Sequence, residues 1–307
     1  MTGHGLIPFL CPECRGTLSD LPSSLVCCDC GKTYPVVDGI PCFAGNDTFY
    51  EGKWAEPDES AGSIRNRLVK KERFFLDELR GRSGKILDLG CGGGWRLFAS
   101  VGHSVGVDVS LGSLQSARSL YNQVAQSRLS KLPFSDESFD FVVSSDVLGH
   151  ISLAEKDAVL GEIHRVLKPG GRTLHYVEAD GDDPLMRFAK VYPDLYSKYV
   201  VEPEGHIGLE AARKVDLRFE KVGFRIRAAK PCYKGLTYVG RFVQYFDNEY
   251  KDKSGSIRWL VRACQLATVV GPVELASNLA MSLLIEVGDL ALPDSWAGGM
   301  LICCEKV

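Results

Sequence analysis

Short apolar runs separated by polar turns, with helically spaced segments between them, make up the middle of this chain. Lys85–Leu87 predicts a short buried strand that leads into the glycine-rich turn Asp88–Gly94, after which a helix is expected. His103–Asp108 predicts a second strand, and Phe139–Ser145 predicts another, which follows the polar turn Ser135–Ser138. Strands that alternate with helices are typical of an α/β domain built on a parallel sheet.

The second half of the pattern predicts the rest of this sheet and a helical insertion. A helix is expected to end at Pro169–Gly171, with a strand starting at Arg172, and Phe224–Ala228 and Met300–Lys306 predict two more strands. Two helices are expected in the insertion, about residues 231–299, and the second carries an apolar stripe. The stripe consists of Leu275, Ala276, Leu279, Ala280, Leu283, Leu284 and Val287. We expect it to be buried against the first helix or the core; the alternative is a lid over a hydrophobic or lipid-linked ligand.

The segment before the first predicted strand is expected to form a polar linker followed by a helix. Residues 44–62 are polar and contain Gly, Asn, Pro and acidic residues, which predicts a linker. Ser63 predicts the N-cap of a helix that runs to about Arg80, with Ile64, Leu68 and Phe75 near one face. The predicted units are therefore residues 1–45, a linker and helix at 46–84, and the α/β domain at 85–307.

The composition narrows the class of protein. Apolar residues make up 45% and charged residues 24% of the chain, as in soluble globular proteins, and the net charge of -3 argues against a protein that coats nucleic acid. Met1–Leu10 lacks a basic region and an apolar core, so we expect no signal peptide, and no apolar run is long enough to span a membrane. A cytoplasmic location is the expectation.

The cysteines near the N-terminus have the spacing of a metal site. Cys11, Cys14, Cys27 and Cys30 form the pattern CxxC-x12-CxxC. Two thiolates three residues apart on a tight turn can bind one metal ion, and two such turns complete a tetrahedron around zinc. Without a secretory signal, cysteines arranged in pairs favour a metal over disulfides. We therefore predict a structural zinc site on these four thiolates.

Several motifs together resemble one enzyme family. The glycine-rich turn alone is a weak signal, but an acid that ends the following strand, Asp108, can accept hydrogen bonds from ribose hydroxyls. The motifs are LDLGCGGG (87–94), GVDVS (106–110), LPFSDESFDFVVSSDVLGHI (132–151) and EIHRVLKPGGR (162–172). In this order they resemble the class I S-adenosylmethionine (SAM)-dependent methyltransferases, in the branch of the ubiquinone/menaquinone methyltransferases. The resemblance implies a Rossmann-like, mostly parallel sheet whose last strand is antiparallel, with SAM as cofactor and S-adenosylhomocysteine as product.

The resemblance also implies which residues contact the cofactor. The methionine end would be lined by Asp88, Gly90, Gly92 and Ser145, the ribose diol would be bound by Asp108, and the adenine would lie near Val109 and Leu129. The helix predicted from Ser63 would cover the cofactor or pack on the sheet edge. At the position where the family usually has an acid that binds the adenine amine, this chain has Arg128, which cannot accept a hydrogen bond.

A second resemblance concerns the N-terminal segment. Leu10–Phe43 resembles the small zinc-ribbon proteins that activate several tRNA- and protein-modifying methyltransferases. A ribbon of this size cannot bury enough surface alone, so the metal would supply much of its folding free energy.

The sequence predicts the catalytic residues and the methyl acceptor in less detail than the fold and the cofactor. An oxygen acceptor benefits from a base. The candidate catalytic residues are His150, which follows the predicted strand Phe139–Ser145, and His206, which follows the strand that starts at Arg172. The first hypothesis is methyl transfer to a small-molecule or lipid-linked acceptor, through an oxygen of a sugar, quinone or secondary metabolite, with a peripheral membrane contact as an option. The second is an rRNA or tRNA methyltransferase that uses the ribbon for recognition, which the charge balance disfavours. The third is a non-catalytic adaptor with a SAM fold.

Overall fold

The structure is a computed structural model of the 307-residue chain. It describes residues 6–58, 69–203, 205–235 and 271–307, together with isolated residues between 236 and 270. Everything below refers to these described residues.

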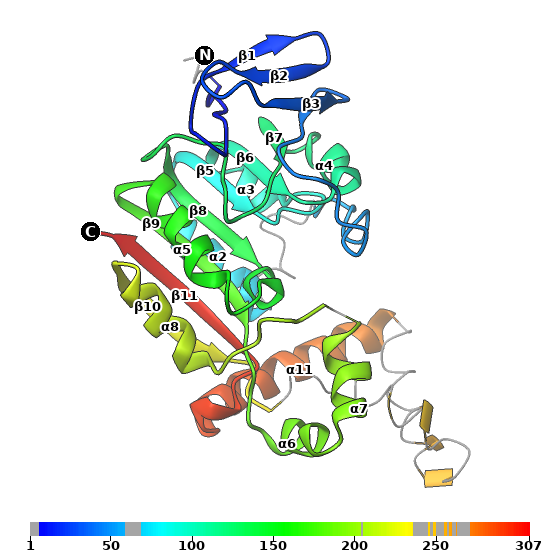
Figure 1. Cartoon of the computed structure of the whole chain (residues 1–307). Coiled ribbons are helices and arrows are strands. Elements are labelled where there is room, and N and C mark those ends of the chain that lie inside the picture. The colour runs from blue at the N-terminus through cyan, green and yellow to red at the C-terminus, as the bar shows by residue number, and fades with distance from the viewer. Residues whose placement is uncertain are drawn as a thin grey trace.

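A four-stranded antiparallel sheet near the N-terminus lies at one end of the molecule (Figure 1). Its strands follow one another in sequence order: β1 (Leu18–Leu21), β2 (Ser24–Cys27), β3 (Thr33–Val37) and β4 (Ile40–Pro41). A parallel bridge joins Cys42 to Gln126 at the edge of the large sheet, and the backbone N–H of Phe43 donates to the carbonyl oxygen of Gln126 at 2.8 Å. The small sheet is therefore attached to the outer strand of the large one.

The large sheet has seven strands in the order β10-β11-β9-β8-β5-β6-β7. The strands are β5 (Gly84–Leu89), β6 (Gly102–Asp108), β7 (Gln123–Gln126), β8 (Phe139–Ser145), β9 (Leu167–Glu178), β10 (Phe224–Cys232) and β11 (Gly299–Lys306). Strands β5 to β9 pair in parallel, whereas β11 lies antiparallel to both β9 and β10. The carboxyl ends of β5, β6, β8 and β9 consequently meet at one edge, which is where open α/β sheets bind ligands.

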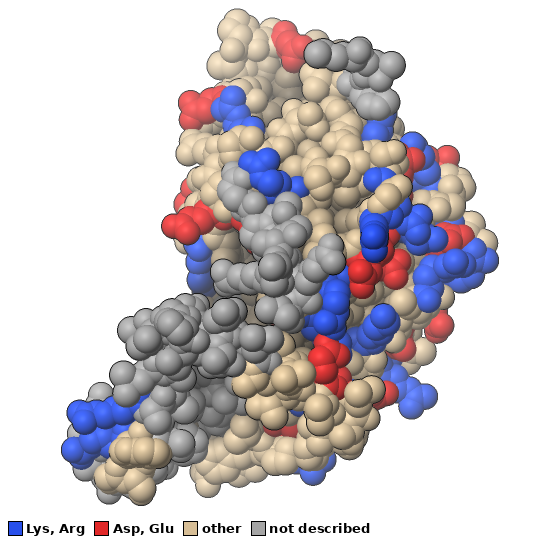
Figure 2. Space-filling model, turned by 180° about the vertical axis from the view of Figure 1, so that it is seen from behind, with Lys and Arg blue, Asp and Glu red and all other residues tan. Residues whose placement is uncertain are grey.

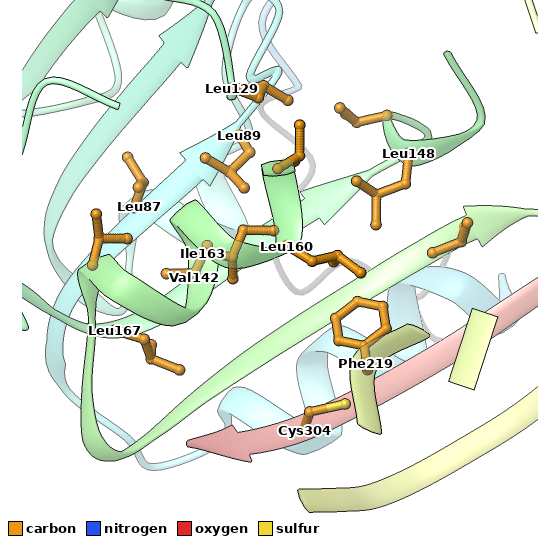
Figure 3. Close-up of a cluster of buried hydrophobic side chains, with 14 of the residues drawn as sticks. Leu87, Leu89, Leu129, Val142, Leu148, Leu160, Ile163, Leu167, Phe219 and Cys304 are labelled. Atoms are coloured by element: carbon orange, nitrogen blue, oxygen red, sulfur yellow. The ribbon is translucent and has the colours of Figure 1, made fainter. Parts of the chain in front are cut away.

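Helices cover both faces of the large sheet and bury its apolar side chains. On one face lie α5 (Lys156–Val166) and α8 (Ala212–Lys221), and on the other α2 (Lys70–Leu79), α3 (Arg96–Ala99) and α4 (Leu111–Ala117). Leu160 of α5 and Phe219 of α8 pack toward Leu87, Val142 and Cys304 of the strands (Figure 3). Each strand contributes alternate side chains to the two faces, so the sheet is buried on both sides, as its apolar runs predicted.

The remaining elements lie in the connections that follow β8, β9 and β10, and the helices α6, α7 and α11 among them are seen in the lower part of Figure 1. They are η1 (Leu148–His150), α6 (Pro184–Val191), α7 (Pro193–Tyr196), η2 (Ser197–Val201), α11 (Gly271–Ala291) and η3 (Asp294–Trp296). Helix α11 is held to α2 by ion pairs, because Lys70 of α2 contacts Asp289 at 2.6 Å and Glu286 at 3.4 Å.

The α/β class, the antiparallel last strand and the helical insertion are confirmed, but several element bounds are corrected. The prediction that Pro169–Gly171 separates a helix from a strand is wrong: α5 ends at Val166 and β9 begins at Leu167, which pairs with Phe139 across an irregular register. The sequence pattern did not predict β7, which has only four residues. The described helix before β5 begins at Lys70, and its predicted cap, Ser63, lies outside the described residues.

The burial predicted for the apolar stripe of α11 is also wrong where the structure describes it. Leu283, Leu284 and Val287 are 65%, 57% and 60% exposed. The helix faces α2 with its charged residues instead, because Glu286 and Asp289 pair with lysine and arginine side chains there. The first predicted helix of the insertion lies largely outside the described residues. No helix in the described part of the chain is long and apolar enough to cross a membrane.

Candidate functional site

A cavity of about 810 Å³ opens at the carboxyl edge of the large sheet. The last residues of three parallel strands line it: Asp108 of β6, Ser145 of β8 and Glu178 of β9, and Asp88 near the end of β5 joins them. Its volume lies within the range of small-molecule sites. Four polar side chains thus meet in one cavity because parallel strands end side by side.

The glycine-rich turn after β5 forms one wall of this cavity. Gly90 and Gly92 have φ values of 61° and 52°, in the left-handed region where a side chain is strained. The backbone N–H of Gly92 donates to Oδ2 of Asp108 at 2.8 Å, and the N–H of Cys91 donates to the carbonyl oxygen of Val107 at 3.1 Å. The turn is therefore tied to the end of β6.

Asp108 is buried and its carboxylate is well ordered by backbone donors. Besides the N–H of Gly92, the N–H of Ser110 donates to its Oδ1 at 2.8 Å. A carboxylate offers about four lone-pair positions, so two donors leave acceptor capacity toward the cavity. Burial raises the pKa of Asp108, and the backbone donors act in the opposite direction.

Asp88 lies in a drier environment than Asp108. The hydroxyl of Tyr121 donates to Oδ2 of Asp88 at 2.6 Å. Burial, with the nearby Asp108 charge, raises the pKa of Asp88 to about 8, although the Tyr121 hydrogen bond lowers it. A cationic group bound beside Asp88 would favour its ionised form. This pair of acids therefore gives the wall of the cavity an affinity for positively charged ligand groups.

The residues predicted to lie near an adenine are also at the cavity. Val109 and Leu129 line it, and the carbonyl oxygen of Val109 accepts a hydrogen bond from the Gln126 amide at 2.8 Å. Arg128 lines the rim with an exposed side chain. Leu129 is nearly buried, at 8% exposed, and provides an apolar surface beside the acidic strand ends.

Ser145 lies at the end of β8, beside a charged pair. Its hydroxyl donates to Oδ2 of Asp146 at 2.5 Å, and the ammonium group of Lys71 from α2 pairs with the same carboxylate. Asp146 has φ 61°, so the chain turns sharply directly after the strand. The pair connects α2 to the loop that follows β8.

Sequence reasoning missed the contribution of residues 44–58, here named the connecting segment. It was predicted as a linker, but its backbone pairs with the glycine-rich turn: the carbonyl oxygen of Trp54 accepts from Gly93 N–H at 2.7 Å. Asp58 exchanges backbone hydrogen bonds with Gly94 and Arg96 at 2.9 and 2.8 Å. Backbone contacts do not depend on residue type, and the available signal was three aromatic residues, Phe49, Tyr50 and Trp54, in a largely polar stretch.

Two of these aromatic residues lie against the far end of the cavity. The rings of Tyr50 and Trp54 have centroids 5.8 Å from the imidazole of His150. His150 in turn lies beside His206, with 4.7 Å between ring centroids. The structure thus brings together the two histidines that the sequence singled out, although 56 positions separate them.

Glu178 lies between the two histidines and was also missed. Its Oε1 is 3.4 Å from Nε2 of His206 and 3.7 Å from Nε2 of His150, and all three side chains are largely buried. Burial lowers the pKa of His150, while the charge of Glu178 raises it. An acid at the end of a parallel strand was the signal that identified Asp108, and the same signal would have found Glu178.

The four predicted metal-ligating cysteines also come together, in the turns next to β1 and β2, and none of them lines the cavity. One sulfur from each of Cys11, Cys14, Cys27 and Cys30 lies within 4.8 Å of the others. The Cys11–Cys30 and Cys14–Cys27 sulfurs are 3.7 and 3.4 Å apart. Zinc–sulfur bonds of about 2.3 Å place tetrahedral sulfurs about 3.8 Å apart, so the spacing is compatible with one zinc ion.

The contact of the connecting segment with the turn gives a direct prediction. A Cβ on Gly93 would lie 2.4 Å from the carbonyl oxygen of Ala55, so Gly93→Ala must displace the segment. We expect a loss of about 1–3 kcal/mol of unfolding free energy and weaker SAM binding, measured by denaturation and calorimetry. Gly161→Ala is the control: no atom lies within 4 Å of its Cβ, and alanine favours the helix α5. Equal stability of both variants would contradict a packed connecting segment.

The fold and the cavity together define an α/β enzyme domain that binds a nucleotide cofactor at the carboxyl ends of its parallel strands. A family model described as "Methyltransferase domain" matches residues 87–175. The ubiquinone/menaquinone biosynthesis C-methyltransferase UbiE of Vibrio vulnificus (strain YJ016) is 32% identical over 202 residues, which are 60% of this chain and 73% of that protein. The chain belongs to the class I SAM-dependent methyltransferases.

Two further similarities cover a smaller part of the protein that is matched. The 24-methylenesterol C-methyltransferase 2 of Arabidopsis thaliana is 30% identical over 171 residues, 47% of this chain and 46% of that enzyme. The solved structure of Haemonchus contortus phosphoethanolamine N-methyltransferase 2 with S-adenosyl-L-methionine is 20% identical, with a TM-score of 0.47. That match covers 76% of this chain and 51% of the other. This chain spans about half of each of these two proteins.

Proposed function

We propose that this enzyme methylates a small-molecule or lipid-linked acceptor, through an oxygen atom of a sugar, quinone or secondary metabolite. The observation that carries the proposal is the single cavity that runs from the glycine-rich turn to His150 and His206. We call the side of the cavity formed by Asp88, the glycine-rich turn and Asp108 the cofactor wall. A cavity with this wall and a second end lined by aromatic residues and histidines can hold donor and acceptor together. Methyl transfer from a sulfonium is an in-line displacement, so positioning and exclusion of water are the main tasks of the protein.

The residues present fit SAM, which supplies an activated methyl group when bound. In the proposal, Asp88, Gly90, Gly92 and Ser145 contact its methionine end, Asp108 binds the ribose diol, and Val109 and Leu129 lie beside the adenine. The free acceptor capacity of Asp108 suits two hydroxyl groups. The carboxyl of Asp88 suits a neighbouring positive charge, because burial without one raises its pKa. Arg128 at the rim leaves adenine recognition to backbone and apolar contacts.

The charge of the cavity supports a small acceptor over RNA. Its lining contains Lys71 and Arg128 as bases, against nine acids. The acids are Asp47, Glu56, Asp58, Glu72, Asp88, Asp108, Asp146, Glu155 and Glu178. Such a lining repels a phosphate backbone. On the surface shown in Figure 2, acidic and basic side chains are mixed among the described residues, which form no continuous basic track there.

The acceptor end of the cavity is where we place His150 and His206. Both line the cavity beyond the cofactor wall, and Tyr50 and Trp54 of the connecting segment pack against His150. We propose that both histidines lie beside the reacting oxygen of the methyl acceptor. The exposed apolar residues of α11 provide a further surface for a lipid-linked acceptor or a membrane contact.

The N-terminal unit is proposed as a zinc ribbon, with Cys11, Cys14, Cys27 and Cys30 as ligands. The sulfur spacing and the small apolar core around Leu25 and Tyr34 support it. The proposed units are the ribbon at 1–45, the linker and helix at 46–84, and the methyltransferase domain at 85–307, in the cytoplasm.

The acceptor class is tested by methyl transfer from labelled SAM into RNA, protein, lipid and small-molecule fractions of a cell extract. We expect label in the lipid or small-molecule fraction, and no label with Asp108→Ala, which removes the proposed ribose ligand. Asp136→Asn, an exposed acid outside the cavity, serves as the matched control and should label as the wild type does. Label confined to RNA would refute the proposed acceptor class.

A further inference from the structure

Three side chains at the acceptor end of the cavity converge from separate segments of the chain. His150 ends η1, Glu178 ends β9, and His206 follows η2. One donor atom from each lies within 4.8 Å of the other two. Their positions are fixed by backbone contacts: Gly208 N–H donates to the carbonyl oxygen of Gly149 at 2.9 Å, which joins the loops that carry the two histidines.

We propose that His150, Glu178 and His206 form a binding site for a divalent first-row transition metal ion. Metal–nitrogen and metal–oxygen bonds of about 2.1 Å place tetrahedral donors about 3.4 Å apart. The two measured spacings to Glu178 Oε1, 3.4 Å from His206 and 3.7 Å from His150, agree with this value. They exceed the 2.7–3.2 Å of an ordinary N–H···O hydrogen bond.

Unpartnered buried atoms support the same conclusion. Oε2 of Glu178 and Nδ1 of His206 are both buried, and neither has a hydrogen-bond partner among the described residues. Glu178 and His206 are 6% and 8% exposed, so water reaches them poorly. A buried carboxylate without a hydrogen bond to each oxygen is costly unless a cation lies beside it. Lys156, a nearby ammonium group, is engaged by Glu210 at 3.0 Å.

The surroundings of His150 are those of a metal ligand. Its Nδ1 lies 3.3 Å from the carbonyl oxygen of Gly205, which favours the tautomer with a proton on Nδ1. Nε2 then directs its lone pair toward Glu178 and the cavity. Histidine ligands are commonly oriented by such a contact of the other ring nitrogen. Two histidines and one carboxylate leave coordination positions open, as in catalytic metal sites.

An open position facing the cavity deepens the function proposed above, because a hydroxyl or carbonyl oxygen of the acceptor could occupy it. This role rests on the proposed function, whereas metal binding by the three side chains does not. The experiment therefore measures binding in the absence of any acceptor, so that a wrong acceptor class and an absent metal site give different results.

The test is a titration of the full-length chain with Co²⁺ under reducing conditions, followed by absorption spectroscopy. Cobalt in the four-cysteine cluster gives a thiolate-to-metal charge-transfer band, and cobalt on two histidines and a carboxylate does not. We expect both kinds of spectrum in the wild type. Glu178→Gln should keep the first and lose the second, with affinity reduced more than about 100-fold, since loss of an outer-shell partner alone costs roughly 10- to 100-fold.

Two further variants make the result decisive. His206→Gln should behave like Glu178→Gln, which guards against an effect of one substitution on folding. His164→Gln is the matched control, because His164 belongs to α5, packs on Phe224 and does not line the cavity, and it should keep both spectra. Thermal unfolding verifies that each variant is folded. A wild-type chain with thiolate-type binding alone, or a second spectrum that survives in Glu178→Gln and His206→Gln, would overturn the proposal.

Discussion

Replacing Cys14 with serine is expected to unfold the N-terminal ribbon and to weaken cofactor binding at a distance. The sulfur of Cys14 lies 3.4 Å from that of Cys27 within the four-cysteine cluster. The ribbon buries few apolar side chains of its own, chiefly Leu25 and Tyr34 with two of the cysteines. Structural zinc contributes about 10–16 kcal/mol in zinc-finger peptides, so with zinc bound as proposed, the loss of one ligand would remove most of the free energy that stabilises this unit.

Unfolding of the ribbon should also weaken cofactor binding, because the ribbon contacts the large α/β domain through hydrogen bonds, ring packing and an ion pair. Leu10 N–H donates to Pro133 O at 2.9 Å, and the ring of Phe9 packs on Phe134. Glu13 pairs with Lys131 at 2.6 Å. The connecting segment follows the ribbon directly, so an unfolded ribbon releases one end of the segment that pairs with Gly93. Reordering even two residues costs about 1–2 kcal/mol each, which predicts SAM binding at least about 10-fold weaker.

The measurement combines amide hydrogen exchange with calorimetric SAM binding. In Cys14→Ser we expect protection to be lost over residues 6–43 and retained over β5 to β9. Cys28→Ser is the matched control: it is a cysteine-to-serine change in the turn after β2, exposed and outside the cluster. A Cys14→Ser protein with intact protection and wild-type SAM affinity would disprove a zinc-dependent ribbon.

The fold class could be predicted from the sequence, because strands that are buried on both faces of a sheet consist of apolar runs, as β5, β6 and β8 do. The sequence also predicted that Asp108 and the glycine-rich turn lie together, since that prediction depends on residue type at fixed spacing. It did not identify β7, which is short, or the path of β9 through Pro169–Gly171, which depends on pairing with Phe139. The exposed stripe of α11 was wrongly expected to be buried, because periodicity reports an apolar face and does not report what covers it.

The arrangement of side chains at the acceptor end of the cavity could not be predicted from the sequence. His150 and His206 were selected by position after two strands, yet their meeting around Glu178 is a property of the tertiary structure. The contribution of Tyr50 and Trp54 depends on how the connecting segment folds back, which backbone hydrogen bonds to Gly93 and Gly94 determine. Residue type carries little information about such contacts, because any residue except proline can provide them. The cofactor and catalytic roles of the individual residues stay predictions until the variants are measured.

Asp108→Ala is expected to have the largest effect on SAM affinity of any single change in the cofactor wall. In the proposal, the carboxylate binds two ribose hydroxyls, and hydrogen bonds to a charged group contribute about 1.5–3 kcal/mol each. Loss of both predicts binding weaker by roughly 100-fold or more. The substitution also removes the acceptor of the Gly92 and Ser110 N–H groups, so the glycine-rich turn loses one of its two hydrogen bonds to β6 and keeps the one from Cys91 to Val107.

A control substitution of an acid at the opposite end of the strands distinguishes an effect on SAM binding from an effect on folding stability. Asp140 lies near the amino end of β8, accepts the N–H of Lys85 at 2.8 Å and pairs with Lys168 at 2.6 Å. Asp140→Asn should lower the free energy of unfolding and leave the SAM dissociation constant unchanged, because that end of the sheet lies away from the cavity. If calorimetry showed equal SAM affinity in Asp108→Ala and Asp140→Asn, the ribose contact would have to be placed on another residue. A large difference between them would instead locate cofactor recognition at the carboxyl end of β6.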